Sequence, residues 1–179
     1  AQLIDAVTAA FHKAGKKVVV VLNIGGVIET ASGNGKTDAI LLAWQAGQEG
    51  GNSVADVLTG KACPSGKLPM TFPVAFADHA SSANFPIDGA VSEFGFDRKE
   101  NAEKKNLWDY TRYEEDIYVG YRYFDSFGKN VAYPFGYGLS YTTFSYGTPT
   151  VETAEGTCVV TVEVTNTGNV AGREVVQLY

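Results

Sequence analysis

The apolar positions in the first part of the chain follow a helical spacing and then form short continuous runs. Within residues 2–14 the apolar residues recur every three or four positions, at Leu3, Val7, Phe11 and Ala14. This spacing predicts an amphipathic helix whose apolar face packs on a sheet. Gly15 is expected to end the helix, because glycine readily adopts the backbone conformation of a helix stop.

Two apolar runs follow, Val18–Leu22 and Ala39–Trp44. Short runs rich in β-branched residues are typical of parallel strands that are covered on both faces. Together with a helix expected after residue 51, the first ~75 residues predict the order helix, strand, helix, strand, helix. The predicted fold class is therefore α/β, with an open, mainly parallel sheet flanked by helices.

A glycine-rich loop, Gly47-Gln-Glu-Gly-Gly51, comes directly after the second run. Open α/β sheets bind their ligands outside the carboxyl ends of the strands, so Gln48 and Glu49 are the candidate substrate-binding residues. Asn52 or Ser53 is expected to cap the next helix, and Gly60 to stop it. The residues of this helix expected to face inward are Val54, Val57 and Leu58.

The periodicity is lost after this helix. Residues 63–73 contain three prolines and a glycine, which predicts an extended, turning segment that leaves the sheet. Residues 74–108 predict a long loop draped over another surface, with isolated aromatic anchors at Phe76, Phe85, Phe94, Phe96 and Trp108. His79 in this loop is expected to be solvated rather than catalytic, and His12 is a weaker catalytic candidate still.

Acidic and aromatic residues crowd residues 114–125. The acidic residues Glu114, Glu115 and Asp116 are expected to form a solvated face rather than an acid/base pair. The aromatic residues Tyr118, Tyr121, Tyr123 and Phe124 are expected to pack against another domain. The segment Tyr133–Tyr141, with four aromatic residues and two glycines, predicts a tightly packed hinge.

The tail has the period-two pattern of a strand. Val160, Val162 and Val164 alternate with polar residues over 157–165, a turn is expected at 166–169, and a second strand over Glu174–Tyr179. Such strands are typical of an antiparallel sandwich, which takes about seven strands and about 100 residues. We therefore expect the natural polypeptide to continue past Tyr179, since an incomplete sandwich leaves exposed strand edges.

Composition and charge exclude several classes of function. The formal net charge of −6 and the pI of about 4.9 argue against a nucleic-acid partner. No apolar run approaches the roughly 18 residues of a membrane span, and no signal peptide is apparent, so either the protein is cytosolic or its beginning is missing. Cys63 and Cys158 are expected to be free thiols, and no metal site is predicted. The loop Asn23–Gly26 lacks the full glycine pattern of a phosphate cradle, which disfavours nucleotide binding.

Taken together, the motifs along the chain resemble glycoside hydrolase family 3. They are Val18-Val-Val-Val-Leu-Asn-Ile-Gly25, Gly47-Gln-Glu-Gly-Gly51 with Ala55-Asp-Val-Leu58, Pro64-Ser-Gly-Lys-Leu-Pro69 with Thr71-Phe-Pro73, Tyr118-Val-Gly-Tyr-Arg-Tyr123 and Pro134-Phe-Gly-Tyr-Gly-Leu-Ser-Tyr141. The resemblance spans the whole chain. It implies that residues 1–142 belong to the C-terminal α/β sandwich domain of such an enzyme, and that residues 143–179 begin a truncated fibronectin III-like domain.

The resemblance also implies the chemistry. The family typically comprises β-glucosidases and β-xylosidases, and retaining glycosidases use two carboxyl groups about 5 to 5.5 Å apart. In the family the nucleophilic Asp lies in an N-terminal barrel-like domain, and the usual acid/base Glu lies shortly before a segment similar to Gln2-Leu3-Ile4. Neither catalytic residue is therefore expected on this chain. Glu49 is no substitute for them, and we favour a loop-ordering role for it over substrate contact.

We therefore expect a C-terminal fragment of a retaining β-glycosidase that acts on terminal non-reducing β-linked glucosyl or xylosyl residues, inactive on its own. Its expected partners are an oligosaccharide or β-glycoside substrate and the missing barrel domain, without a cofactor. A periplasmic or secreted location follows from the resemblance alone. The alternative is a noncatalytic carbohydrate-binding or scaffold domain, which the flanking sequence would distinguish.

Overall fold

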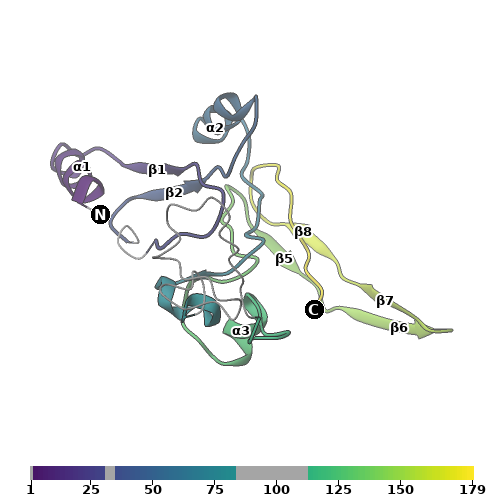
Figure 1. Ribbon diagram of the computed structural model, residues 1–179. Helices are drawn as coiled ribbons and strands as arrows, with labels where there is room; N and C mark the ends of the chain where they lie inside the picture. Colours follow the sequence, from purple (N-terminus) through teal and green to yellow (C-terminus); the bar gives the residue numbers. More distant parts are fainter. Residues whose placement is uncertain (1, 31–34, 84–112) are drawn as a thin grey trace, which may run out of the picture. The chain divides into compact units, whose positions relative to one another are not determined.

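The computed structural model of the protein describes residues 2–30, 35–83 and 113–179 (Figure 1). The helices are α1 (Gln2–Lys13), α2 (Gly50–Leu58) and α3 (Tyr121–Ser126), with short 3-10 helices η1 (Phe76–Asp78) and η2 (Ala80–Ala83). The strands are β1 (Val19–Leu22), β2 (Ala39–Leu42), β3 (Phe72–Pro73), β4 (Val131–Tyr133), β5 (Phe144–Tyr146), β6 (Thr150–Ala154), β7 (Thr157–Thr161) and β8 (Val164–Asn166). The chain divides into two compact units, unit 1 (residues 1–20, 26–40 and 70–135) and unit 2 (residues 21–25, 41–69 and 136–179).

Helix α1 confirms the predicted first helix to within one residue. Gly15 follows it with a φ of +67° and donates its N–H to the His12 carbonyl, 2.9 Å, so the predicted stop is also confirmed. The predicted packing of its apolar face is wrong, however, because Leu3 is 76% and Phe11 51% exposed. Helical spacing identifies an apolar face but not the surface that covers it, and the described residues leave the Leu3 and Phe11 side chains exposed.

Strands β1 and β2 confirm the two predicted runs and pair in a two-stranded sheet. The Asp38 N–H donates to the Val18 carbonyl at one end (3.0 Å), and the Ala43 N–H to the Leu22 carbonyl at the other (2.9 Å). From one bond to the other the residue numbers rise on both strands, so the strands run parallel, as expected. The helix expected between them is not present in residues 23–30 or 35–38, so the predicted order is wrong at that point.

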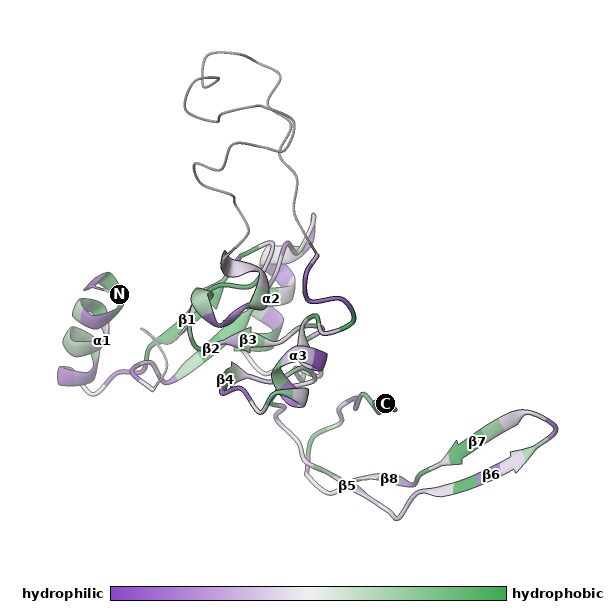
Figure 2. Cartoon of the chain, turned by 60° about the horizontal axis from the view of Figure 1, so that its bottom comes forward, coloured by the Kyte–Doolittle hydropathy of each residue, from purple (hydrophilic) through white to green (hydrophobic). Residues whose placement is uncertain are grey.

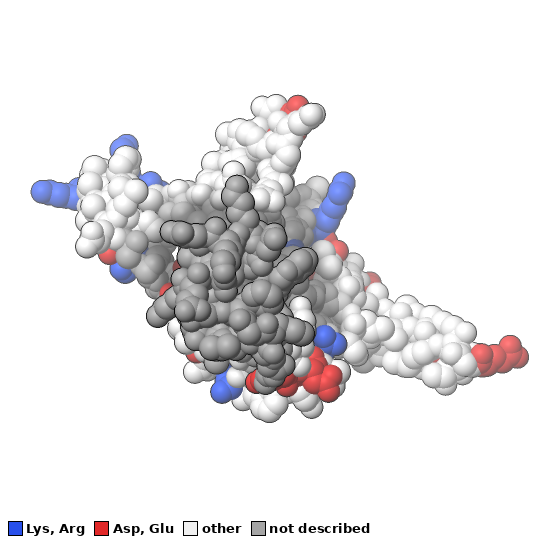
Figure 3. Space-filling model, in the orientation of Figure 1, with Lys and Arg blue, Asp and Glu red and all other residues white. Residues whose placement is uncertain are grey.

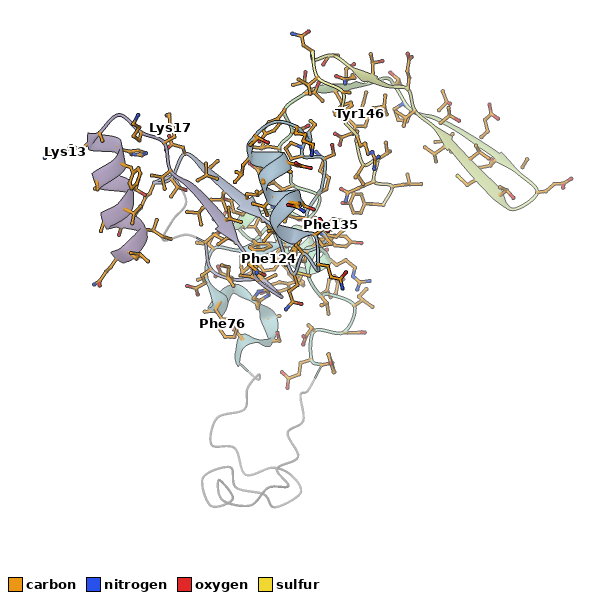
Figure 4. The ribbon with its side chains drawn as sticks, turned by 90° about the horizontal axis from the view of Figure 1, so that it is seen from above. Lys13, Lys17, Phe76, Phe124, Phe135 and Tyr146 are labelled. Carbon is orange, nitrogen blue, oxygen red and sulfur yellow. The ribbon has the colours of Figure 1, made fainter. Side chains whose placement is uncertain are left out.

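The core of unit 1 lies in the proline-rich segment and α3. Among the residues that the structure describes, Phe72 (2% exposed) and Phe124 (1%) are its buried hydrophobic residues. Strand β3 pairs antiparallel with β4, which brings the Phe72 ring edge-to-face with Tyr133 at 6.3 Å between centroids. Phe124, labelled in Figure 4, also contacts Tyr123 edge-to-face at 5.3 Å. The segment that was expected only to turn away from the sheet is thus a core element of its own.

The aromatic residues of 118–124 pack largely against other residues of unit 1. Phe124 is buried inside the unit, which corrects the expectation that this residue packs on another domain. Phe76, one of the expected loop anchors, is 54% exposed, whereas Phe85, Phe94, Phe96 and Trp108 lie outside the described residues. Glu114 and Asp116 are exposed, as expected of a solvated face. Figure 3 shows acidic side chains gathered at the lower edge of the view, in the region where Figure 1 labels α3.

In unit 2 the tail forms a two-stranded antiparallel ribbon, in which β5 pairs with β8 and β6 with β7 (Figures 1 and 2). Glu155 and Gly156 connect β6 to β7 with φ of +48° and +79°. Two consecutive positive φ values are typical of the tight turns that match the twist of a hairpin. The tail strands are thus antiparallel, but their partners are not the predicted ones, because β7 and β8 pair with the preceding strands β6 and β5 and not with residues 174–179.

The burial pattern of the tail agrees with the predicted alternation only in part. Val160, Val162 and Val164 are half-buried and their polar neighbours exposed, but the strand is interrupted at residues 162–163. The predicted strand Glu174–Tyr179 is not formed, because this segment carries no regular hydrogen-bond pairing. Among the described residues, no helix is both long and apolar enough to cross a membrane.

Candidate functional site

The candidate loop leaves the carboxyl end of β2, as the sequence predicted. Backbone pairing ends with the Ala43 N–H bond to β1, and the chain then turns sharply at Trp44, whose φ is +49°. A positive φ is unusual for a bulky residue. Gly47 turns the chain a second time, with a φ of +69°. These two turns place Gln48 and Glu49 on the exposed surface just ahead of α2.

The loop after β1 supports the loop after β2. A Cβ added to Gly25 would lie 3.0 Å from the Gln45 side-chain nitrogen, so the Gln45 amide rests on the Gly25 backbone. The glycine is therefore used for contact with a side chain of the same unit. Residues 27–30 form no helix, so the loop Asn23–Gly26 also lacks the helix N-terminus that a phosphate cradle uses.

Glu49 itself is the N-cap of α2, which corrects the assignment of the cap to Asn52 or Ser53. The Asn52 side-chain amide donates to Glu49 Oε2 at 2.6 Å, and the Ser53 hydroxyl donates to the Glu49 carbonyl at 2.9 Å. Both polar residues thus bond back to Glu49 from inside the first turn. The helix begins earlier than expected because Gly50 already adopts helical geometry. An added Cβ at Gly50 would lie 2.8 Å from the Ala46 side chain, so no larger residue fits there.

The far end of α2 is closed by its own residues and by Tyr141. The predicted stop is confirmed, since Gly60 has a φ of +78° and donates its N–H to the Val57 carbonyl at 3.0 Å. The Tyr141 hydroxyl donates to the same carbonyl at 2.9 Å. Val54 and Val57 are half-buried as expected, but Leu58 is 47% exposed, contrary to the predicted inward face. The helix that carries Glu49 is thus fixed at both ends.

His12 lies in a charged cluster around Asp38 in unit 1. Asp38 accepts hydrogen bonds from Lys17 Nζ, the Val18 N–H and His12 Nε2, each at 2.8 Å. The Lys17 bond, then the Val18 and His12 bonds, hold the pKa of the Asp38 carboxyl well below its usual range. Figure 4 places Lys17 between α1 and β1, so this cluster joins the helix to the sheet. Sequence reasoning did not predict this cluster, because Asp38 is distant along the chain from its three donors.

His79 is not solvated, which corrects the prediction. Its half-buried ring packs edge-to-face on Phe124 at 5.7 Å and on Phe76 at 6.3 Å between centroids. Such contacts are typical of a packed aromatic cluster rather than of a proton-transfer site.

The described residues hold no group of three or more His, Cys, Asp or Glu side chains arranged to bind a metal ion. Cys63 and Cys158 are both free thiols, as predicted. The candidate site of this chain is therefore a structured polar loop, in which Gln48 supplies an amide and Glu49 a carboxylate already engaged with Asn52. Such groups can accept or donate hydrogen bonds to hydroxyl groups of a ligand.

Comparison with known proteins extends this description. The sequence model described as the glycosyl hydrolase family 3 C-terminal domain matches residues 1–141. β-Glucosidase B of Emericella nidulans is 42% identical over 98% of this chain and 20% of its own length. An exo-α-(1→6)-L-arabinopyranosidase of Bifidobacterium longum is 40% identical over 93% of the chain and 20% of its own length. The chain thus spans about a fifth of the length of these relatives.

Solved structures of β-glucosidases are also similar to this chain. The structure of β-glucosidase 3B from Thermotoga neapolitana in complex with glycerol superimposes with a TM-score of 0.76 and 48% identity, over 93% of this chain and 21% of that chain. The Bifidobacterium adolescentis GH3 β-glucosidase superimposes with a TM-score of 0.74 and 38% identity, over 94% of this chain and 22% of that chain.

Proposed function

The chain belongs to glycosyl hydrolase family 3, and on that basis we propose that it is the C-terminal part of a longer polypeptide that hydrolyses terminal non-reducing β-linked glucosyl or xylosyl residues with retention. The observation that carries this proposal is the similarity to β-glucosidases over nearly the whole chain, in sequence and in structure. We further propose that residues 1–142 complete a parallel α/β sandwich domain, and that residues 143–179 begin a fibronectin III-like domain. The match of the family to residues 1–141 supports this division.

Retention requires a nucleophilic carboxylate and a second carboxyl group that acts first as acid and then as base. We place both outside this chain, the nucleophile in a preceding barrel-like domain and the acid/base residue upstream of Ala1. The engagement of two described carboxylates by protein donors supports this assignment. Asp38 is bonded by three donors of its own unit, and Glu49 accepts the Asn52 amide. The role left to this chain is to shape and support the catalytic centre.

Within that role we assign substrate contact to the loop of Gln48 and Glu49, where it lines the interface with the preceding domain. The two residues have different roles. The Glu49 carboxylate orders the loop through its 2.6 Å bond from Asn52. The exposed Gln48 amide is then presented to a sugar hydroxyl at the end of a strand, where α/β sheets bind ligands.

The test is expression of this chain joined to its natural upstream sequence, followed by assay on three aryl glycosides: a β-glucoside, a β-xyloside and an α-L-arabinopyranoside. We include the third because a relative that is 40% identical is an arabinopyranosidase. We expect the β-glucoside or the β-xyloside to be hydrolysed, with the β-anomer as the first product by NMR. The 179-residue chain alone should be inactive, because nucleophile and acid are needed together. Turnover by the chain alone, or inversion by the long form, would contradict the proposal.

The second candidate is a noncatalytic carbohydrate-binding or scaffold domain. The engagement of Asp38 and Glu49 by protein donors is also compatible with this candidate. An upstream sequence without an Asp nucleophile, combined with sugar binding but no turnover, would favour this candidate.

A further inference from the structure

The segment of residues 172–177 carries no regular secondary structure, yet it is held at defined points of unit 2. The Arg173 N–H donates to the Ser65 hydroxyl at 3.0 Å. A Cβ added to Gly172 would lie 2.8 Å from the Thr142 methyl group and 3.4 Å from the Cys63 sulfur. The backbone of this segment therefore lies directly against residues distant in sequence, in a contact that only glycine permits at position 172.

The surface that receives this segment consists of two loops, residues 63–68 and 136–140, which we call the docking loops. The Leu68 N–H donates to the Tyr137 carbonyl, and the Gly136 N–H donates to the Leu68 carbonyl, both at 2.8 Å. An added Cβ at Gly138 would lie only 2.3 Å from the Gly66 carbonyl oxygen. The docking loops thus hold each other without help from the segment, and they form a preorganised surface.

A charge pair joins the segment to this surface. Lys67 Nζ lies 3.3 Å from Glu174 Oε1, with side chains only 17% and 12% exposed, and it also donates to the Gly138 carbonyl at 2.8 Å. Removing one partner of a largely buried pair leaves the other charge desolvated and unpaired, so the pair strongly favours this one placement.

Tyr146 on β5, labelled in Figure 4, forms a hydrogen bond with the same carboxylate. Local burial, then a hydrogen bond with Glu174 and its charge, raise the pKa of the Tyr146 phenol, although half of the side chain is exposed. Glu174 therefore contacts both a docking loop and the tail ribbon.

We infer that the docking loops form an intramolecular peptide-docking site, whose ligand is the chain's own extended segment 172–177, recognised by the pairing of Glu174 with Lys67. The end of the segment fits the same description, because the Gln177 side chain occupies the space above Gly136, only 2.1 Å from where a Cβ would stand. The site gives a function to two family motifs that carry no catalytic residue. This inference does not depend on the proposed hydrolysis, and the two are tested by separate experiments.

The test is amide hydrogen exchange, measured by mass spectrometry on the full chain and its variants. We expect Glu174→Gln and Lys67→Met each to speed exchange of residues 172–177 by about tenfold or more, while α2 keeps its protection. The double variant should exchange no faster than the faster single variant, because both changes remove the same contact. Ser65→Ala, which changes no charge, should speed exchange at the Arg173 amide alone.

Glu152→Gln is the matched control, because it makes the same chemical change at an exposed position of β6. It should leave the exchange of residues 172–177 unchanged. Three results would overturn the inference: unchanged exchange of 172–177 in both single variants, effects that multiply in the double variant, or equal acceleration in α2, which would show that the pair supports the whole unit rather than a docked segment.

Discussion

Replacement of Gly138 by alanine tests a close approach of two backbone segments. Among the described glycines, Gly138 is the one at which an added Cβ would come nearest to another backbone atom. The added methyl group would lie 2.3 Å from the Gly66 carbonyl oxygen, about 1 Å closer than ordinary van der Waals contact. The neighbouring atom belongs to the backbone, so rotation of a side chain cannot relieve the overlap. The docking loops must instead move apart.

The cost follows from what holds these loops together. Overpacking of a well-packed site costs about 1–3 kcal/mol. A separation of about 1 Å also stretches the 2.8 Å bond from Lys67 Nζ to the Gly138 carbonyl beyond useful length, and the net worth of one such bond is about 1 kcal/mol. We therefore expect Gly138→Ala to lower the free energy of unfolding by about 2–4 kcal/mol. For a domain of this size that is a fall in Tm of about 4–16 °C.

Urea unfolding followed by tyrosine fluorescence and circular dichroism measures this difference. Gly66→Ala is the matched control, since a Cβ at Gly66 meets nothing within 4 Å and its φ is not left-handed. That variant should be unchanged or more stable by up to about 1 kcal/mol, because it restricts the unfolded chain. The reasoning is refuted if Gly138→Ala unfolds within about 0.5 kcal/mol of the parent, or if both variants lose the same stability.

Three further predictions concern other parts of the chain. Phe124→Ala should cost about 3–5 kcal/mol and abolish the near-UV circular dichroism of unit 1, whereas Phe127→Ala, at a ring that is 55% exposed, should cost less than half as much. Because the pKa of Asp38 is lowered in the folded state, its stabilisation is complete above the unfolded pKa near 3.9 and is lost as the pH falls through the folded value. Asp38→Asn should therefore lower stability at pH 7 and weaken its dependence on pH below about 4, and superimposable acid-unfolding curves would contradict this. In the longer enzyme, Glu49→Gln should lower stability or reduce activity modestly, whereas a loss of about 10⁴-fold in kcat at unchanged Tm would assign chemistry to Glu49 instead.

Local pattern predicted the elements whose formation depends on neighbours along the chain. The spacing of Leu3 and Phe11 located α1, and the apolar runs located β1 and β2. The same spacing did not predict that the apolar face of α1 is exposed, because periodicity identifies an apolar face but not the surface that packs against it. For the same reason the sequence predicted the alternation around Val162 but not the break in the strand there.

The candidate loop was predicted in position but not in detail. Its place after β2 followed from the apolar run and the glycines around Gln48. The cap was assigned to the wrong residue because Asn52 is a good capping residue by type, whereas in the structure it donates its side-chain amide to Glu49. His79 was misjudged because the ring it packs on, Phe124, comes from a helix far along the chain.

The glycines of the family motifs indicate that this chain resembles its relatives because its fold requires these residues. Gly25 receives the Gln45 side chain, Gly50 has no room for a Cβ beside Ala46, and Gly138 touches the Gly66 carbonyl. Gly50 and Gly138 exclude larger residues through contacts inside their own unit, and no substrate is needed to explain these contacts. A sequence can therefore match the family closely along this chain for reasons of packing alone. That is consistent with relatives of about 40% identity carrying the names β-glucosidase and arabinopyranosidase.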